Sequence, residues 1–342
     1  MPKTVTIKDV ARLAGVSPTT VSHALGGQRP VSAAARTRVR EAAERLGYTP
    51  HPGARSLKAA GTGVLALCLT NVTGGALPYA GMEYYFRVVN SATQTAMEQH
   101  FAMVVVPDSD SGMFWDRLLL DGAIIVDPVT GDPNLRALRA RSLPCVTVGR
   151  DPDAPDEGFW TDNDAEAATR LSLDHLAARG ARSVAAITWL TTEYWTQASI
   201  RAYLAWCEET GRSPRLEVVA EDTEAALREA AERVLAPEAC PDAVFGIAEL
   251  PALWVLRVAA ERGVRVPEDV LVAGTSDFGL GATSTPPMTT LDYNSDEHGR
   301  QAARLLIDLV RGVTPPLPRR VIPVSLIERE STGRGPEPQD PT

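Results

Sequence analysis

The sequence predicts an α/β protein: a two-lobed body of doubly wound parallel sheets, preceded by a small all-α domain. Seven short apolar runs between residues 63 and 275 mostly alternate with amphipathic helical stretches. Continuous apolar strands separated by helices indicate parallel sheets covered on both faces. Residues 6–47 instead show three helical patterns punctuated by glycines. A chain of 342 residues is long enough for about two or three domains.

The first two helical patterns predict a helix-turn-helix. Thr6 can cap a helix that Gly15 ends, and apolar residues recur between them at helical spacing. Ser17 can cap a second helix from Pro18 to about Leu25, with proline at the first helical position. Its polar face holds short hydrogen-bonding side chains: Thr19, Thr20, Ser22 and His23. Two short helices around a glycine-containing turn are typical of DNA-binding proteins, in which the second helix enters the major groove.

A third helix and a short linker follow. Ser32 can cap a helix that runs to Leu46 and ends at Gly47, with an outer face that carries Arg36, Arg38, Arg40 and Arg45. Residues 53–57 form a weak helical pattern that begins with a glycine. A helix this short is marginal in isolation, so we expect it to form only when something packs on it.

The charge distribution restricts DNA affinity to the N-terminal end. The formal net charge is -9, but residues 1–60 hold ten Lys or Arg and three Asp or Glu. The first 60 residues therefore carry seven surplus positive charges, and the remaining residues carry sixteen surplus negative charges. We expect the basic end to attract phosphate and the acidic body to repel it.

The body consists of predicted strands and helices in alternation. The strand-like runs are GVLALCLTN, FAMVVVP, GAIIVDP, PCVTVGR, SVAAITW, DAVFGIA and DVLVAGT, and helical stretches cover Glu166–Arg179, Ala198–Glu209, Glu221–Leu235 and Pro251–Arg262. This number of strand and helix units is too large for a single hydrophobic core, which predicts two lobes. Ligands of such folds bind beyond the carboxyl ends of the strands, so we expect a site between the lobes.

Two other classes of protein fit the sequence less well. A secreted solute-binding protein would have an export signal and no basic N-terminal domain, and the polar N-terminus offers no such signal. An enzyme on a doubly wound sheet would carry a phosphate-binding loop or a nucleophile with its base. The first strand is followed by TNVTGGALPY, which has neither pattern. Five scattered histidines and four distant cysteines predict no metal and no cofactor, with the cysteines as reduced thiols.

Dense motifs along the chain resemble the lactose-repressor and galactose-repressor family of bacterial transcription regulators. The N-terminal motifs are TIKDVARLAGVSPTTVSHAL, VSAAARTRVREAAERLGYTP and ARSL. The body motifs are WTDNDAEAATRLSLDHLAARGARSVAAI, RVPEDVLVAGTSDF, PPMTTLDYNSDEHGRQAARLLIDLVRG and RRVIPVSLIERESTG. The resemblance covers roughly residues 4–335. It implies a periplasmic-binding-protein-like body behind a helix-turn-helix domain, and a repressor that acts in the bacterial cytoplasm, at the nucleoid.

The resemblance implies domain boundaries. The helix-turn-helix domain would span 1–49, the hinge helix and linker 50–60, and the effector-binding and dimerisation body 61–330. Within the body, the N-terminal lobe would comprise about 61–160 plus 292–318, and the C-terminal lobe about 161–291 plus 319–330. Residues 331–342 are proline-rich and polar, so we expect a disordered tail.

The resemblance also implies contacts to DNA. Pro18 and Thr19 match major-groove readers, and Leu57 matches a wedge that enters the minor groove and unstacks a base step. Two hinge helices open one groove symmetrically, which implies a homodimer on palindromic operator DNA. His23 stands where an arginine is common, so base preference there should be unusual. The DNA-binding residues that we expect are Thr6, Ser17, Pro18, Thr19, Thr20, Ser22, His23, Tyr48, Ala54, Arg55 and Leu57.

An effector site between the lobes is implied as well, for a sugar or related metabolite that controls DNA binding allosterically. This sequence has Ser199 and Ser276 where the family has an arginine and an aspartate, and Gly149 where an acidic anchor is common. Aromatic residues and a few polar residues remain. The expected effector-binding residues are Tyr85, Phe86, Arg150, Glu193, Trp195, Ser199, Phe245, Ser276 and Asp277. Trp195 could equally pack the lobes together, and Arg150 and Asp277 could equally form structural ion pairs.

Overall fold

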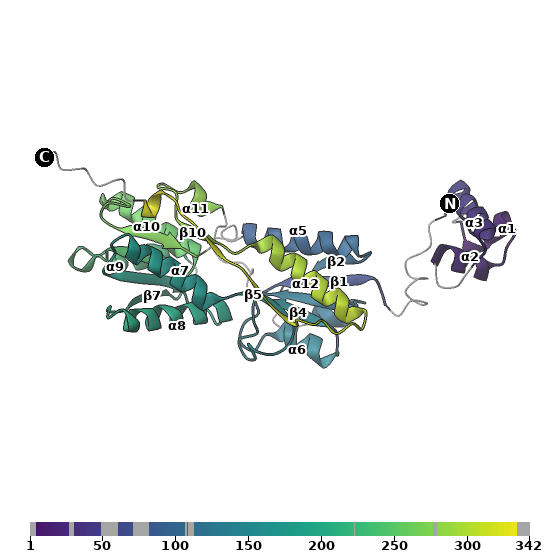
Figure 1. Cartoon of the computed structure of the whole chain (residues 1–342), viewed down its shortest axis with the longest axis horizontal. Coiled ribbons are helices and arrows are strands. Elements are labelled where there is room, and N and C mark those ends of the chain that lie inside the picture. Colours follow the sequence, from purple (N-terminus) through teal and green to yellow (C-terminus); the bar gives the residue numbers. More distant parts are fainter. Residues whose placement is uncertain are drawn as a thin grey trace. The chain divides into compact units, whose positions relative to one another are not determined.

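A computed structural model describes residues 5–26, 31–48, 61–70, 82–106, 108, 113–221, 223–275 and 279–333. The chain divides into two units, Met1–Gly63 and Val64–Thr342. Figure 1 shows the helical first unit and the larger α/β body. The predicted hinge residues Ala54, Arg55 and Leu57, the loop residues Ser276 and Asp277, and the tail from residue 334 lie outside the described residues.

The first unit contains the three predicted helices, α1 (Ile7–Ala14), α2 (Pro18–Gly26) and α3 (Ala33–Leu46). Gly15 and Gly47 end α1 and α3 with positive φ angles of 64° and 61°, which glycine adopts without strain. The helices meet around small and branched apolar residues, with Val10, Val21 and Val39 fully buried at the centre. The helix-turn-helix and its core are therefore as predicted.

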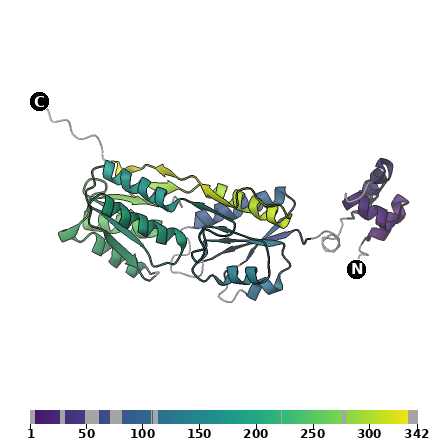
Figure 2. The same ribbon diagram turned by 60° about the horizontal axis from the view of Figure 1, so that its bottom comes forward.

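The first lobe of the body is built on a six-stranded parallel sheet. Its order is β11-β5-β4-β3-β1-β2. The strands are β1 (Val64–Leu69), β2 (Ala102–Val106), β3 (Gly122–Val126), β4 (Cys145–Val148), β5 (Trp160–Asn163) and β11 (Arg319–Ile322). Helices α5 (Met82–Glu98) and α12 (Ser295–Val310) cover one face, and η1 (Met113–Arg117) and α6 (Pro133–Ala140) cover the other. Figure 2 shows the same layers from a second direction.

Helices α5 and α12 approach each other unusually closely at Gly299. A Cβ added there would lie 2.1 Å from Ser91 Oγ and 2.3 Å from the Val88 carbonyl oxygen. These distances are far below van der Waals contact, so a side chain at position 299 would force the helices apart. Glycine is thus required at position 299 by packing, not by its backbone conformation.

The second lobe has a four-stranded parallel sheet in the order β7-β6-β8-β9. Its strands are β6 (Val184–Trp189), β7 (Arg215–Val219), β8 (Ala243–Gly246) and β9 (Leu271–Gly274). Helices α7 (Ala165–Ala178) and α8 (Tyr194–Glu209) pack on one face, and α9 (Glu224–Val234) and α10 (Glu249–Arg262) on the other. The short η2 (Pro237–Ala239) and α11 (Leu280–Thr283) complete the lobe.

The lobe boundaries differ from the predicted ones by a few residues. Residues 161–163 and 319–322 were expected in the second lobe, but they form most of β5 and all of β11 in the sheet of the first lobe. The chain returns through β12 (Ser325–Ile327), which pairs antiparallel with β10 (Thr290–Asp292), and ends the described part after η3 (Glu330–Thr332). Ser331 donates to the Val272 carbonyl, so η3 belongs with β9 and is not part of a disordered tail. Among the described helices, none has the length and apolar character needed to span a membrane.

Candidate DNA interface and effector site

The first turn of α2 presents the predicted groove-reading residues to solvent. Ser17, Pro18 and Thr19 are exposed, whereas Ser22 and His23 are half-buried. The Ser17 hydroxyl accepts the Thr20 backbone N–H at 3.1 Å and lies 2.8 Å from the Thr20 hydroxyl. This cap fixes the start of α2 and leaves its positive end accessible to phosphate.

Thr6 and Tyr48, both predicted to bind DNA, also make contacts within the first unit. Thr6 stands at the N-cap position of α1, as predicted, and its hydroxyl and backbone N–H donate to the Asp9 carboxylate at 2.6 and 3.0 Å. This hydroxyl is already engaged, and the DNA contact of Thr6 stays a prediction. Tyr48 packs partly against the helical core, and its N–H donates to the Ala43 carbonyl at 2.9 Å.

The arginines of α3 divide into one packing residue and a basic face. Arg38 Nε donates to the Ala14 carbonyl oxygen at 3.3 Å, so it ties the end of α1 to α3, a role that the sequence analysis did not predict. Arg36, Arg40 and Arg45 are exposed. Within the described part of the first unit, only Arg12 and Asp9 form an ion pair, at 3.3 Å. The α3 arginines therefore keep their positive field for a polyanion.

In the body, Asp127 is a candidate site residue that the sequence analysis missed. It directly follows β3 with a φ of 52°, and its N–H donates to the Val148 carbonyl at 2.8 Å. The Tyr85 hydroxyl donates to its carboxylate. Burial raises the pKa of Asp127 well above its usual range, and the charge of Glu193 in the second lobe raises it further. A polar residue directly after an apolar strand run is the signal that could have identified it.

Arg150 is surrounded by aromatic and acidic partners. Its Nε lies 3.2 Å from Asp162 Oδ2, and its guanidinium carbon lies 4.4 Å from the centre of the Trp160 ring. Across the lobe junction it lies 4.8 Å from the centre of the Tyr194 ring and donates to the Tyr194 hydroxyl at 3.2 Å. Burial raises the pKa of Asp162 to about 7, against the opposing effect of Arg150. Arg150 thus forms the structural ion pair that was one of its two predicted roles.

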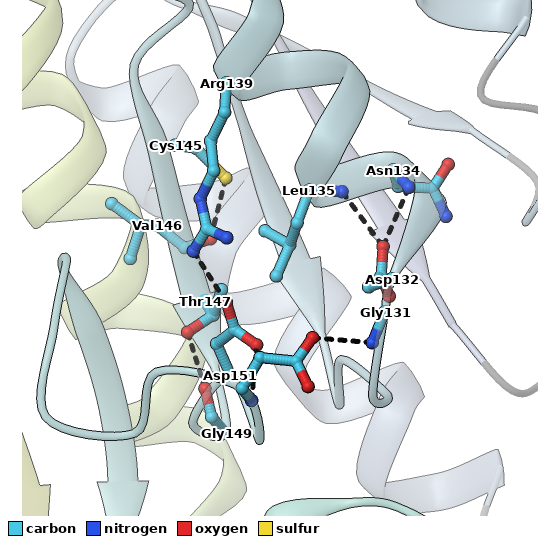
Figure 3. A network of polar contacts seen from close by, with 11 residues as sticks. Gly131, Asp132, Asn134, Leu135, Arg139, Cys145, Val146, Thr147, Gly149 and Asp151 are labelled. Atoms are coloured by element: carbon cyan, nitrogen blue, oxygen red, sulfur yellow. Dashed lines mark hydrogen bonds and ion pairs between the residues drawn. The ribbon is translucent and has the colours of Figure 1, made fainter.

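A polar network surrounds α6 and the loop that follows β4 (Figure 3). The Asp132 carboxylate caps α6 by accepting the backbone N–H groups of Asn134 and Leu135 at 2.8 and 2.9 Å. Arg139 Nη2 donates to Asp151 at 2.7 Å, and Asp151 adjoins Arg150 in the chain. The loop that carries Arg150 is therefore held to α6 as well as to the sheet.

An aromatic cluster joins the two lobes near Glu193. The rings of Trp195 and Tyr293 meet edge to face with 4.8 Å between their centres, and Tyr84 lies 6.4 Å from Tyr293. The Trp195 indole nitrogen is buried and has no hydrogen-bond partner among the described residues. The structure thus brings Tyr85, Glu193 and Trp195 to the lobe junction.

Three other predicted effector residues differ from these in their surroundings. Phe245 is fully buried among α7, α8 and the sheet, where it packs as a core residue, and its ligand contact stays a prediction. Ser199 is fully buried on the inner face of α8, and its hydroxyl has no hydrogen-bond partner in the described part of the chain. Phe86 is 70% exposed on α5 and does not share the environment of Tyr85. Among the described residues, no group of three or more His, Cys, Asp or Glu side chains could hold a metal ion.

Comparison with known proteins matches both units. The model for "Bacterial regulatory proteins, lacI family" matches residues 6–51, and that for "Periplasmic binding protein-like domain" matches residues 173–332. The HTH-type transcriptional regulator CelR of Thermobifida fusca is 31% identical over 340 residues, which are 95% of this chain and 98% of that protein.

Two solved structures show the same architecture over nearly the whole chain. The transcriptional regulator CelR-cellobiose complex has a TM-score of 0.70 and 28% identity, over 96% of this chain and all of that one. The lac repressor dimer bound to operator and the anti-inducer ONPF has a TM-score of 0.80 and 23% identity, over 96% of this chain and 99% of that one.

Proposed function

The chain belongs to the lacI family of bacterial regulatory proteins, and from this premise we propose that it represses transcription as a homodimer on a palindromic operator. It is a DNA-binding transcription regulator with a helix-turn-helix domain and an effector-binding body. Its relatives are regulators, not enzymes. Because its operator would be chromosomal, we further propose that it acts at the nucleoid in the bacterial cytoplasm.

The exposed first turn of α2 is the observation that carries this proposal. Ser17, which caps α2, and Pro18 and Thr19, its first two residues, lie on the surface, and the helix is fixed by the Ser17 cap and the buried Val21. Short side chains at the start of a recognition helix allow close approach to base edges in the major groove. Phosphate contacts would then supply position and affinity, and the groove contacts would supply sequence preference.

Selection from a random duplex library tests operator recognition. We expect full-length protein at low ionic strength to enrich a palindrome whose half-sites are related by two-fold symmetry. Failure to enrich any palindrome would contradict the proposed function.

The same selection tests the assignment of His23. A neutral imidazole cannot make the bidentate contact to guanine that a guanidinium makes. We therefore expect His23→Arg to sharpen the preference for guanine at one position of each half-site, by roughly 1–3 kcal/mol of discrimination. An unchanged sequence profile would show that His23 does not face a base.

An apolar surface on the first lobe supports the homodimer. Strand β2 lies at the end of its sheet and pairs only with β1 among the described strands. Val105 of β2 is 51% exposed, and Phe86 and Met97 on the neighbouring α5 are 70% and 65% exposed. An open sheet edge beside large exposed apolar side chains favours burial against a second copy.

The lobe junction supports a sugar or related metabolite as effector. Trp195 and Tyr85 offer aromatic faces, and Asp127 and Glu193 offer oxygen atoms to hydroxyl groups. The relative CelR is known in complex with cellobiose. We expect a related β-linked disaccharide to bind at this junction. The predicted hinge residues and the predicted effector residues Ser276 and Asp277 lie outside the described residues.

A thermal-shift experiment with cellobiose, and with maltose as its stereochemical control, tests this effector class. We expect cellobiose to raise the midpoint of unfolding and to change operator affinity by roughly 5- to 150-fold, the usual range of allosteric coupling. If neither cellobiose nor any other mono- or disaccharide shifts the midpoint, the effector is not a sugar.

A further inference from the structure

Two direct polar contacts join the lobes near the start of α8. Arg150, which follows β4 in the first lobe, donates to the hydroxyl of Tyr194, the first residue of α8 in the second lobe, at 3.2 Å. Close by, the Thr130 backbone N–H of the first lobe donates to the Thr192 hydroxyl at 3.3 Å. The second contact is exposed, whereas the Arg150 side chain is only 17% exposed.

The guanidinium of Arg150 is held in place by its own lobe. Strand β5 lies beside β4 and supplies both Asp162, 3.2 Å from Nε, and Trp160, whose ring lies 4.4 Å away. An arginine fixed by a carboxylate and an aromatic face has already lost most of its conformational freedom. It therefore offers Tyr194 a preformed partner at little further entropic cost.

Tyr194 meets this partner through two different interactions. Its hydroxyl accepts a hydrogen bond from Nη1, and its ring lies 4.8 Å from the guanidinium carbon. Both interactions are strengthened by partial burial, because water competes less for the charge. The contact can thus be divided experimentally into a hydroxyl part and a ring part.

We propose that Arg150 and Tyr194 form a latch that holds the two lobes together before any effector binds, and that Arg150 is a positioning residue for the effector site. Tyr194 lies between Glu193, the residue before α8, and Trp195. Fixing Tyr194 therefore sets the position of both predicted effector contacts relative to Tyr85 and Asp127 in the first lobe. This inference rests on the proposed effector site, but it concerns the effector-free protein.

Hydrogen exchange and small-angle X-ray scattering of the effector-free full-length protein test the latch together. Tyr194→Phe removes the hydroxyl but leaves the Arg150–Asp162–Trp160 arrangement intact, so it should fold normally. We expect its amides at 197–200 to exchange roughly tenfold faster or more, in keeping with loss of one hydrogen bond from a charged donor. The radius of gyration should increase at the same time, because the lobes separate.

Variants of Arg150 separate the contribution of the hydroxyl contact from that of the ring contact. Arg150→Gln removes both parts of the contact and should exceed Tyr194→Phe on both measurements, whereas Arg150→Lys keeps the charge and should be intermediate. Arg201→Gln is the matched control, since Arg201 lies on α8 with its guanidinium 5.9 Å from the same ring but does not join the lobes. Amides of α10 should be unchanged in every variant.

Each other outcome overturns the latch. Unchanged exchange and unchanged dimensions in Tyr194→Phe and Arg150→Gln would show that the lobes stay closed without this contact. Faster exchange without a larger radius of gyration would make the contact local to α8. Either result would leave operator selection by the same protein unaffected, so failure of the latch is distinguishable from failure of the proposed function.

Discussion

Operator binding is expected to weaken by about 10³- to 10⁵-fold when the salt concentration rises from about 50 to about 200 mM, if six to ten phosphates are contacted. Binding releases condensed counterions from DNA, and the entropy gained from this release becomes smaller as the bulk salt concentration rises. The positive charge is concentrated on the first unit, where Arg36, Arg40 and Arg45 are exposed. Fluorescence anisotropy titrations of a labelled operator at several salt concentrations measure the slope directly.

A control within the body separates this effect from general salt sensitivity. Arg265 already pairs with Asp269 on the second lobe, so Arg265→Gln should leave the salt slope unchanged. The triple replacement of Arg36, Arg40 and Arg45 by Gln should reduce it. A flat salt response of the unaltered protein would contradict DNA binding through the basic first unit.

Replacing Val105 with Asp should produce monomers and weaken operator binding by about 10²- to 10⁴-fold, the usual gain from linking two binding modules. A carboxylate at this half-exposed position on the edge strand β2 would have to be desolvated in the proposed dimer. A monomer binds a palindrome with one recognition helix at a time. Sedimentation velocity gives the oligomeric state, and anisotropy with the selected operator gives the affinity.

Val218 offers a matched control for this substitution. It is 38% exposed on β7, which is the end strand of the sheet in the second lobe. Val218→Asp introduces the same charge on a comparable edge but away from the apolar surface of α5 and β2. If Val105→Asp remains dimeric with unchanged affinity, the two copies associate through another surface.

The elements that follow a strong local signal could be predicted from the sequence. The three helices of the first unit have caps, glycine stops and apolar spacing, and all three form as expected. The seven apolar runs each become a parallel strand. Six of them are buried, as a continuous apolar sequence indicates, whereas β2 lies exposed at the end of its sheet. The two-lobed organisation follows from the number of such units.

The remaining strands could not be predicted because their sequences do not look buried. Strand β5 reads Trp-Thr-Asp-Asn, yet Asp162 and Asn163 are buried, because Arg150 pairs with the first and the second donates to the Ile322 carbonyl. Strand β11 begins with two arginines, and its pairing with β5 joins residues about 160 positions apart. Such elements depend on tertiary partners that no local pattern encodes.

The candidate effector site was predicted only in part for a related reason. Aromatic and polar residues near the ends of the predicted strands were the candidates. The sequence did not show which way the side chain of each one points. Phe245 is in a strand and points into the core, whereas Trp195 is in the first turn of a helix and reaches the other lobe. Asp127 was overlooked because its role depends on a left-handed backbone and on Tyr85, which is distant in sequence.

The contact at Gly299 has a mechanical consequence. The close approach at Gly299 opposes sliding of α5 past α12, so we expect the two helices to move together. One end of this helix pair begins just after Tyr293, which touches Trp195, and its outer side carries Phe86 and Met97. We therefore expect a displacement at the aromatic cluster to be passed on to the exposed side of α5.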